Sequence, residues 1–105
     1  MYDEYETPTM ERIAKGVALL DDKRPNWRRH IDVDGLDLGS PRHCILGQLY
    51  KNDATEGEDG FHIGTRKLGI DHDRLSTEYG FDINDEDSYA DLQREWLKVL
   101  GDDSE

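Results

Sequence analysis

Apolar residues recur at intervals of three and four in two long segments of the chain, a spacing typical of amphipathic helices. The first predicted helix covers residues 9–22. Thr7 or Thr9 can cap its N-terminus, and Pro25 disfavours helix at the residue before it. Two acidic residues, Asp21 and Asp22, stand at the C-terminal end, where the helix dipole disfavours negative charge. We therefore expect them to pair with a neighbouring group.

The second predicted helix covers residues 84–100. Asn84 or Asp85 can cap it, and Gly101 follows its last turn as a stop signal. The pattern places five apolar side chains on one face of this helix: Tyr89, Leu92, Trp96, Val99 and Leu100.

A third helix is predicted over residues 41–50, with Ser40 as the cap and Pro41 in the first turn. It is apolar around much of its circumference, which is typical of a central helix. Gly47 lies inside it and lowers its helix propensity. A close crossing by a neighbouring element would explain this glycine.

The connecting segments are less regular. In residues 31–38, apolar and acidic residues alternate around Gly35, which fits either irregular chain with apolar anchors or a short strand. Residues 51–60 form a polar loop. In the glycine-rich stretch 61–83, a short helix over 73–79 would end at Gly80.

These elements predict a mainly α fold, a compact single domain of three to four helices with long irregular connections. An α+β fold with a short sheet is the alternative. We expect a globular domain over residues 9–100, a flexible acidic lead over 1–8 and a flexible acidic tail over 101–105. The predicted core consists of Leu20, Trp27, Leu36, Leu46, Leu49, Leu92 and Trp96.

Charge narrows the classes of partner. The 105 residues carry a net charge of −12, and 36% of them are charged. Such a chain repels nucleic acid and anionic membranes, because binding either requires cationic residues. It attracts basic partners instead. We therefore do not expect the chain to bind nucleic acid or a membrane directly. We expect its partner to be a protein, with a basic or nucleic-acid-binding one favoured.

The only cysteine, Cys44, follows His43 in an apolar run. A single cysteine excludes an internal disulfide and suits a reducing cytoplasm. The acidic start of the chain does not resemble a signal peptide, and no apolar run reaches the ~18 residues of a membrane span. Adjacent residues diverge around a helix, so His43 cannot serve as the base for Cys44. Packing of Cys44 in the core is favoured over nucleophilic catalysis, which would need a histidine from elsewhere.

No metal or cofactor site is predicted, and no catalytic residue. The histidines are scattered without the paired spacing of a zinc site. The segment "DINDEDSYADLQ", which begins at Asp82, resembles a calcium loop only in part. Asp87 stands where such a loop needs glycine, and Gln93 stands where it needs a bidentate glutamate.

One stretch opposes the overall charge. "KRPNWRRH" places basic residues around an aromatic ring, and its candidate partner-binding residues are Arg24, Trp27, Arg28 and Arg29. Tryptophan and arginine dominate the energetics of many protein interfaces. The favoured interpretation is that Trp27 docks into the core while the cations pair with the acidic tails.

Several blocks together, "GVALLDDKRPNW", "IDVDGLDL", "CILGQLY", "YGFD" and "YADLQREWLKVL", carry a resemblance. In this order they resemble a family of small uncharacterised proteins encoded by actinobacterial phages and by actinobacteria. The resemblance implies no catalytic residue and no cofactor. It implies a phage or prophage accessory protein that acts by binding a host or phage protein.

The sequence therefore predicts a small acidic, non-enzymatic protein-binding module of the cytoplasm. A nucleic-acid mimic that inhibits a DNA-binding protein is one alternative, since acidic residues crowd in four parts of the chain. A virion or assembly component and a small Cys/His enzyme or metal protein are the others. The pattern does not define an oligomeric state.

Overall fold

The computed structural model describes residues 8–84 and 87–103. Within these residues it has no strand, so the mainly α prediction is confirmed and the α+β alternative is wrong. Its elements are α1 (Pro8–Lys23), η2 (Trp27–His30), η3 (Val33–Gly35), α2 (Ile45–Leu49), η4 (Lys51–Asp53), α3 (Gly60–Leu68), α4 (Leu75–Glu78) and α5 (Tyr89–Asp103), where η marks a 3₁₀ helix. The described residues form one compact unit with a radius of gyration of 13.1 Å.

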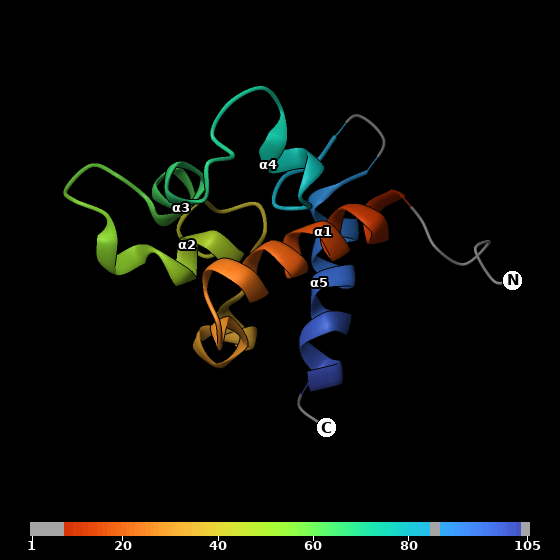
Figure 1. The fold of residues 1–105 in the computed structure, drawn as a ribbon. Coiled ribbons are helices and arrows are strands. Elements are labelled where there is room, and N and C mark those ends of the chain that lie inside the picture. Colours follow the sequence, from red (N-terminus) through yellow and green to blue (C-terminus); the bar gives the residue numbers. More distant parts are fainter. Residues whose placement is uncertain (1–7, 85–86, 104–105) are drawn as a thin grey trace, which may run out of the picture.

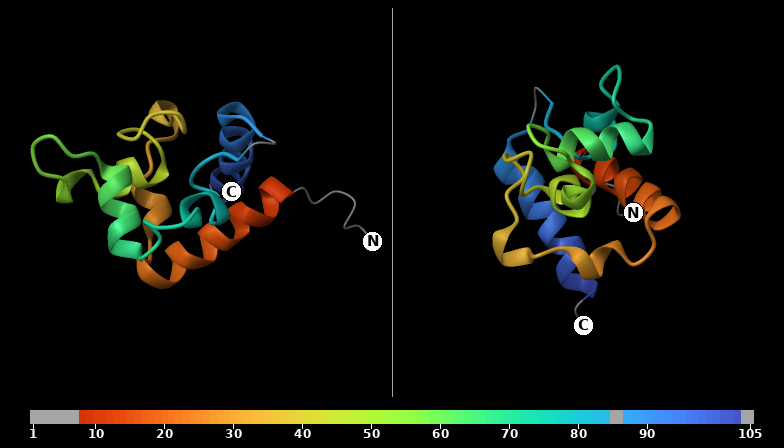
Figure 2. Two further views of the ribbon diagram at one scale, coloured as in Figure 1. Left: turned by 90° about the horizontal axis from the view of Figure 1, so that it is seen from above. Right: turned by 90° about the vertical axis from the view of Figure 1, so that its left-hand side faces the viewer.

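The helix α1 packs against α4 and α5 (Figure 1). α5 crosses α1 near one end, and α2 and α3 pack against each other near the other end (Figures 1 and 2). α4 lies against α1 above the crossing with α5. Among the described elements, α1 is the helix that packs against α5.

Glycine permits the close approach of α2 and α3. A Cβ atom on Gly47 would lie 2.5 Å from the carbonyl oxygen of Pro41, and one on Gly60 would overlap the carbonyl oxygen of Gly47. The predicted close approach at Gly47 is therefore confirmed, and the elements that cause it are the turn before α2 and the start of α3.

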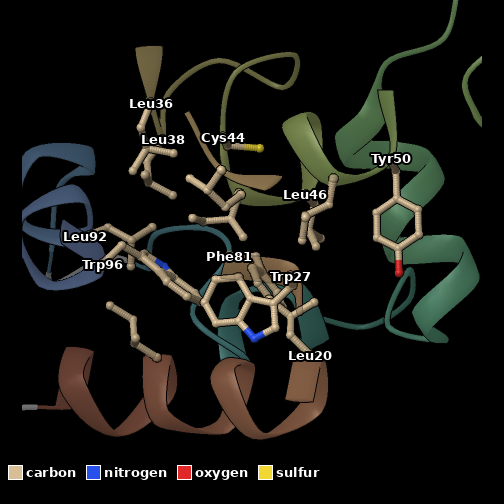
Figure 3. Packing of buried hydrophobic residues seen from close by; sticks show 14 of the residues in the cluster. Leu20, Trp27, Leu36, Leu38, Cys44, Leu46, Tyr50, Phe81, Leu92 and Trp96 are labelled. Carbon is tan, nitrogen blue, oxygen red and sulfur yellow. The ribbon is translucent and has the colours of Figure 1, made fainter. Parts of the chain in front are cut away.

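The core is built around three aromatic rings. Trp96 stacks on Phe81 with ring centroids 5.5 Å apart, and its indole N–H donates to the carbonyl oxygen of Gly80 at 2.7 Å. Trp27 meets Trp96 edge to face, and Leu20 and Leu46 close the cluster (Figure 3). All seven predicted core residues are buried: Leu20, Trp27, Leu36, Leu46, Leu49, Leu92 and Trp96.

α1 extends one residue beyond each predicted bound, but α2 is shorter than the predicted helix 41–50. Residues 41–43 form a turn, and Cys44 rather than Ser40 is the N-cap. The physical reason is the turn's own hydrogen bonding, because the carbonyl oxygen of Ser40 accepts from the N–H groups of both His43 and Cys44. The helix begins only after this turn closes.

α5 begins at Tyr89, later than predicted, because a different pair caps it. The N–H of Asp91 donates to Ser88 Oγ and the N–H of Ser88 donates to Asp91 Oδ2, each at 3.2 Å. This reciprocal pair has the form of a capping box. Asn84 lies outside the helix, and the alternative cap, Asp85, lies outside the described residues. Gly101 lies within α5, which continues to Asp103, so its assignment as a stop is wrong.

The glycine-rich stretch holds a helix that the pattern did not predict. α3 is capped by Asp59, whose side chain accepts from the N–H of His62, and it ends at Gly69 with φ 76°. The predicted short helix over 73–79 is present as α4, and Gly80 follows it with φ 79°. Residues 31–38 are irregular apart from η3, and Val33 is 46% exposed while the other three apolar anchors are buried.

The structure describes only part of the predicted N-terminal lead and C-terminal tail. The lead over 1–8 lies outside the described residues except for Pro8, which opens α1, and so do residues 104–105 of the tail. Among the described helices, none combines the length and the apolar character that a membrane crossing requires.

Candidate protein-binding site

α5 has two faces with different surroundings. Leu92, Trp96 and Leu100 point into the core and are at most 6% exposed. The other side faces a shallow, open groove of about 700 Å³ that is mostly apolar. Its lining comprises Asp37, Tyr89, Ala90, Gln93, Arg94, Leu97 and Lys98. Apart from Asp37, all of these side chains belong to α5, and we call this surface the α5 groove.

Gln93 holds the second wall of the α5 groove in place. Its side-chain amide donates to the carbonyl oxygen of Leu36 at 2.8 Å and its Oε1 accepts from the N–H of Leu38 at 2.9 Å. These two bonds satisfy backbone groups on both sides of Asp37 and fix the irregular segment against α5. The buried anchors Leu36 and Leu38 hold the same segment from below.

Tyr89 forms one end of the α5 groove. It is 41% exposed, and its hydroxyl donates to Asp82 Oδ1 at 3.0 Å. Partial burial and the neighbouring Asp82 carboxylate raise the pKa of the Tyr89 phenol. Gly39 lies against the ring, since a Cβ atom there would be 3.6 Å from two of the ring carbons. The ring is therefore both held in position and open to solvent.

The prediction that Tyr89 belongs to the buried face of its helix is wrong. With the helix starting at Tyr89, this residue lies on its first turn beside Asp82 rather than over the core. Sequence reasoning also missed Leu97, which is half-buried in the α5 groove. The available signal was that Leu97 falls outside the apolar stripe of Leu92, Trp96 and Leu100.

Ion pairs border the α5 groove on the helix side. Arg94 contacts Asp91 at 2.8 Å, and Lys98 contacts Glu95 at 3.4 Å. The hydrogen bond from Arg94, followed by those from Ser88, lowers the pKa of Asp91. Both cations thus have carboxylate partners on their own helix, whereas Asp37 at the opposite wall is exposed and pairs with no cation within the described residues.

The predicted basic stretch is not a single exposed patch. Trp27 is 1% exposed, so its indole is a core group, as the favoured interpretation held. Arg24 lies over the ring of Tyr50 at 4.5 Å, and Arg28 lies over Trp27 at 4.8 Å and 3.5 Å from Asp21. Arg29 is exposed. The acidic tails expected to pair with these cations lie almost wholly outside the described residues.

Cys44 is a core residue whose thiol is buried. It is 2% exposed, and its Sγ accepts from the N–H of Gly47 at 3.3 Å. Burial raises the pKa of the Cys44 thiol to about 11 and outweighs the backbone N–H groups at the start of α2, which lower it. At neutral pH the thiolate, which is the nucleophilic form, is therefore scarce.

A small cavity of about 180 Å³ touches both Cys44 and His62. His62 Nδ1 lies 2.8 Å from Asp59 Oδ1, and the backbone N–H of His62 donates to the same oxygen. His43 points elsewhere, with Nδ1 2.9 Å from Ser40 Oγ. The cavity therefore brings an imidazole near Cys44, but burial raises the pKa of the thiol and its Sγ serves as the N-cap of α2.

The acidic residues of the partial calcium loop are engaged in structure. Asp82 accepts from the Tyr89 hydroxyl and the N–H of Ile83, while Asp87 accepts from Thr9 and Arg12. Across the described part of the chain, no three histidine, cysteine or carboxylate side chains gather closely enough to hold a metal ion.

Comparison with protein families, with curated proteins and with solved structures finds no match to the chain. The assignment of a site therefore depends on the geometry of the α5 groove.

Proposed function

We propose that the chain is a non-enzymatic protein-binding module that receives a segment of its partner in the α5 groove. The observation that carries this proposal is an apolar floor, formed by Ala90 and Leu97 and ended by the exposed ring of Tyr89, on a highly charged chain. Aromatic and aliphatic side chains in a concave surface are the usual anchors of protein interfaces.

The overall charge favours a basic or nucleic-acid-binding protein as the partner. A net charge of −12 accelerates encounter with a cationic surface and repels nucleic acid itself. The resemblance to proteins of actinobacterial phages extends the proposal to an accessory protein that binds or inhibits a host or phage protein in the cytoplasm.

The arginines around Trp27 support a second candidate surface. Arg24, Arg28 and Arg29 gather at the turn after α1, and Arg29 is exposed. Since Trp27 is buried, this surface offers guanidinium groups without an accessible indole. It would therefore suit an anionic segment, whereas the α5 groove suits an apolar one.

The experiment compares two variants that carry the same change at two exposed helical alanines. Ala90→Arg fills the α5 groove, and Ala18→Arg adds the same side chain to the outer side of α1. Tagged wild type, both variants and Arg29→Glu are used to capture proteins from a lysate of cells that naturally make the chain, and recovery is quantified by mass spectrometry.

We expect one set of proteins to be captured by the wild type and by Ala18→Arg and lost with Ala90→Arg. Loss with Arg29→Glu alone would favour the second surface. Equal recovery with all four proteins, or no specific recovery at low salt, would contradict the proposal. Circular dichroism of each variant checks that the helices are intact.

A further inference from the structure

We infer that the segment received by the α5 groove is a basic amphipathic helix whose cationic end lies against Asp37, Tyr89 and Asp82. This inference rests on the proposed function and names the chemical class of the partner. It depends on three properties of the groove: its shape, the distribution of charge at its two ends, and the net charge of the chain.

The shape of the α5 groove favours a helical segment. Its lining residues on α5 recur at helical spacing from Tyr89 to Lys98, a length of about 14 Å at 1.5 Å per residue. A helix laid along such a stripe presents two turns of side chains to it. The described part of the chain has no strand, so it offers no sheet edge to which an extended segment could add.

Negative charge and an aromatic face converge at the Tyr89 end. Asp37 Oδ1 and the Tyr89 ring both lie beside Gly39, at 3.4 and 3.6 Å from the position that a Cβ atom would take there. Asp82 lies at the hydroxyl end of the same ring. A lysine or arginine placed over this ring would gain both a cation–π contact and two nearby carboxylates.

The other end of the α5 groove does not favour a cation in the same way. Arg94 and Lys98 are there, and both are paired with carboxylates of α5, so the pairs leave little net charge. Asp37 lines the groove and Asp82 is bonded to Tyr89 at the opposite end, while Asp91 and Glu95 are the partners of the two cations. A cationic segment is therefore attracted at the Tyr89 end, where an acidic segment would be repelled.

A second copy of the chain fits the α5 groove less well. Two copies would each bring a net charge of −12 to a contact only about two helical turns long. Stable protein interfaces bury roughly 1,200–2,000 Å² in total, more than one such stripe supplies by itself. A basic segment meets the opposite charge and needs no such area to bind with modest affinity.

The test is a titration of the ¹⁵N-labelled protein with two synthetic helical peptides, followed by NMR. Both peptides carry leucines on one face; the flanking positions are lysines in the first and glutamates in the second. We expect the lysine peptide to shift the amides of residues 89–98 and to bind at least about tenfold more tightly than the glutamate peptide at low salt. Added salt should reduce this difference.

Two variants that each lose one negative charge show where the cationic end of the lysine peptide binds. Asp37→Asn removes the carboxylate at the Tyr89 end but keeps an oxygen for the N–H of Gly39, which Asp37 Oδ1 accepts at 3.0 Å. Asp34→Asn removes an exposed carboxylate outside the groove. We expect Asp37→Asn to weaken binding of the lysine peptide about two- to fivefold and Asp34→Asn to change it less.

Equal binding of the two peptides, equal effects of the two variants, or no binding of either peptide up to about 1 mM would overturn the inference. Concentration-dependent shifts of residues 89–98 without peptide would also overturn it, in favour of a second copy. In each of these cases the proposed function still stands if Ala90→Arg abolishes capture. It fails if the capture is independent of the groove or if no protein is specifically recovered.

Discussion

The ring of Trp27 meets the ring of Trp96 edge to face, with centroids 5.9 Å apart and an angle of 88° between the planes. This contact joins the turn after α1 to α5 in the centre of the core. Asp21 Oδ1 accepts from the indole N–H of Trp27 at 2.9 Å. The unfavourable position of Asp21 at the end of α1 is thereby explained, and its predicted pairing with a neighbouring group is confirmed.

Asp21→Ala should therefore destabilise the protein, because a buried indole N–H would lose a charged acceptor. We expect a loss of about 1–2 kcal/mol in the free energy of unfolding, measured by urea denaturation followed through tryptophan fluorescence. Asp22→Ala is the matched control. The Asp22 carboxylate is exposed, and its ion pair with Lys23, at 3.7 Å, lies on the surface. Equal effects of the two substitutions would contradict the assigned role of Asp21.

Gly47→Ala should be strongly destabilising, since its Cβ atom would meet the backbone of Pro41 and Arg42. Backbone cannot move aside as a flexible side chain can, so we expect a cost of about 2–4 kcal/mol. Gly101→Ala is the control within a helix, where a Cβ atom meets no atom within 4 Å. This change should stabilise the protein by up to about 1 kcal/mol through helix propensity. A tolerated Gly47→Ala would show that the turn at Pro41 and Arg42 packs less closely against α2 than the structure indicates.

Much of the fold could be predicted because α1 and the buried stripe of α5 carry a long, regular apolar pattern. α3 could not, because glycines and short apolar patches hide its period. Its stability comes from the Asp59 cap and from contact with α2, and neither follows from local composition. The predicted start of α2 was wrong for a similar reason. Ser40 and Pro41 are typical of a helix start, but in the structure they belong to a turn that precedes the helix.

The candidate site was harder to predict than the core. A stripe pattern identifies the face of a helix that is buried, but Ala90 and Leu97 acquire their role only when Gln93 fixes the segment around Asp37 beside them. That contact joins residues more than fifty positions apart in the chain. The sequence offered the stretch around Trp27 as its candidate surface, because it records that aromatic and basic residues are adjacent there.

Cys44 should give the protein a specific loss of stability at alkaline pH. Burial holds its pKa at about 11, above the ordinary value of 9.0 that the unfolded chain would show. The unfolded state releases this proton first as pH rises, so the contribution is complete below pH 9 and is lost between about 9 and 11. The shift corresponds to a loss on the order of 2–3 kcal/mol.

The measurement is urea denaturation between pH 8 and about pH 11, comparing wild type with Cys44→Ser. Serine can still cap α2 but does not titrate in this range. Since Tyr89 also titrates at alkaline pH, only the difference between the two proteins reports on Cys44. Parallel pH profiles would contradict the assignment, as would rapid labelling of the native thiol at neutral pH.

Arg12 and Asp87 should be strongly coupled. The Arg12 guanidinium donates to Asp87 Oδ2 and to the carbonyl oxygen of Thr77 at 2.9 Å, and the two side chains are only 12% and 7% exposed. Removing one partner leaves the other buried without its counter-charge. We expect Arg12→Ala and Asp87→Ala each to cost about 2–4 kcal/mol, with the double variant costing less than the sum.

The control for this double-mutant cycle is the exposed pair Arg94 and Asp91, 2.8 Å apart. Its coupling should be the smaller of the two, because solvent screens exposed charges. If the Arg12 and Asp87 substitutions were additive, the contact would not join α1 to the segment before α5 in the way described.

The measurement that tests the α5 groove most directly is site-specific photo-crosslinking. A benzoylphenylalanine residue is placed at Ala90 in one protein and at Ala18 in the other, both exposed helical positions, and each is irradiated in the native lysate. We expect a discrete covalent adduct with a protein partner from position 90, suppressed by excess unlabelled wild type, and none from position 18. An adduct of equal yield from both positions, or one from position 18 alone, would contradict it.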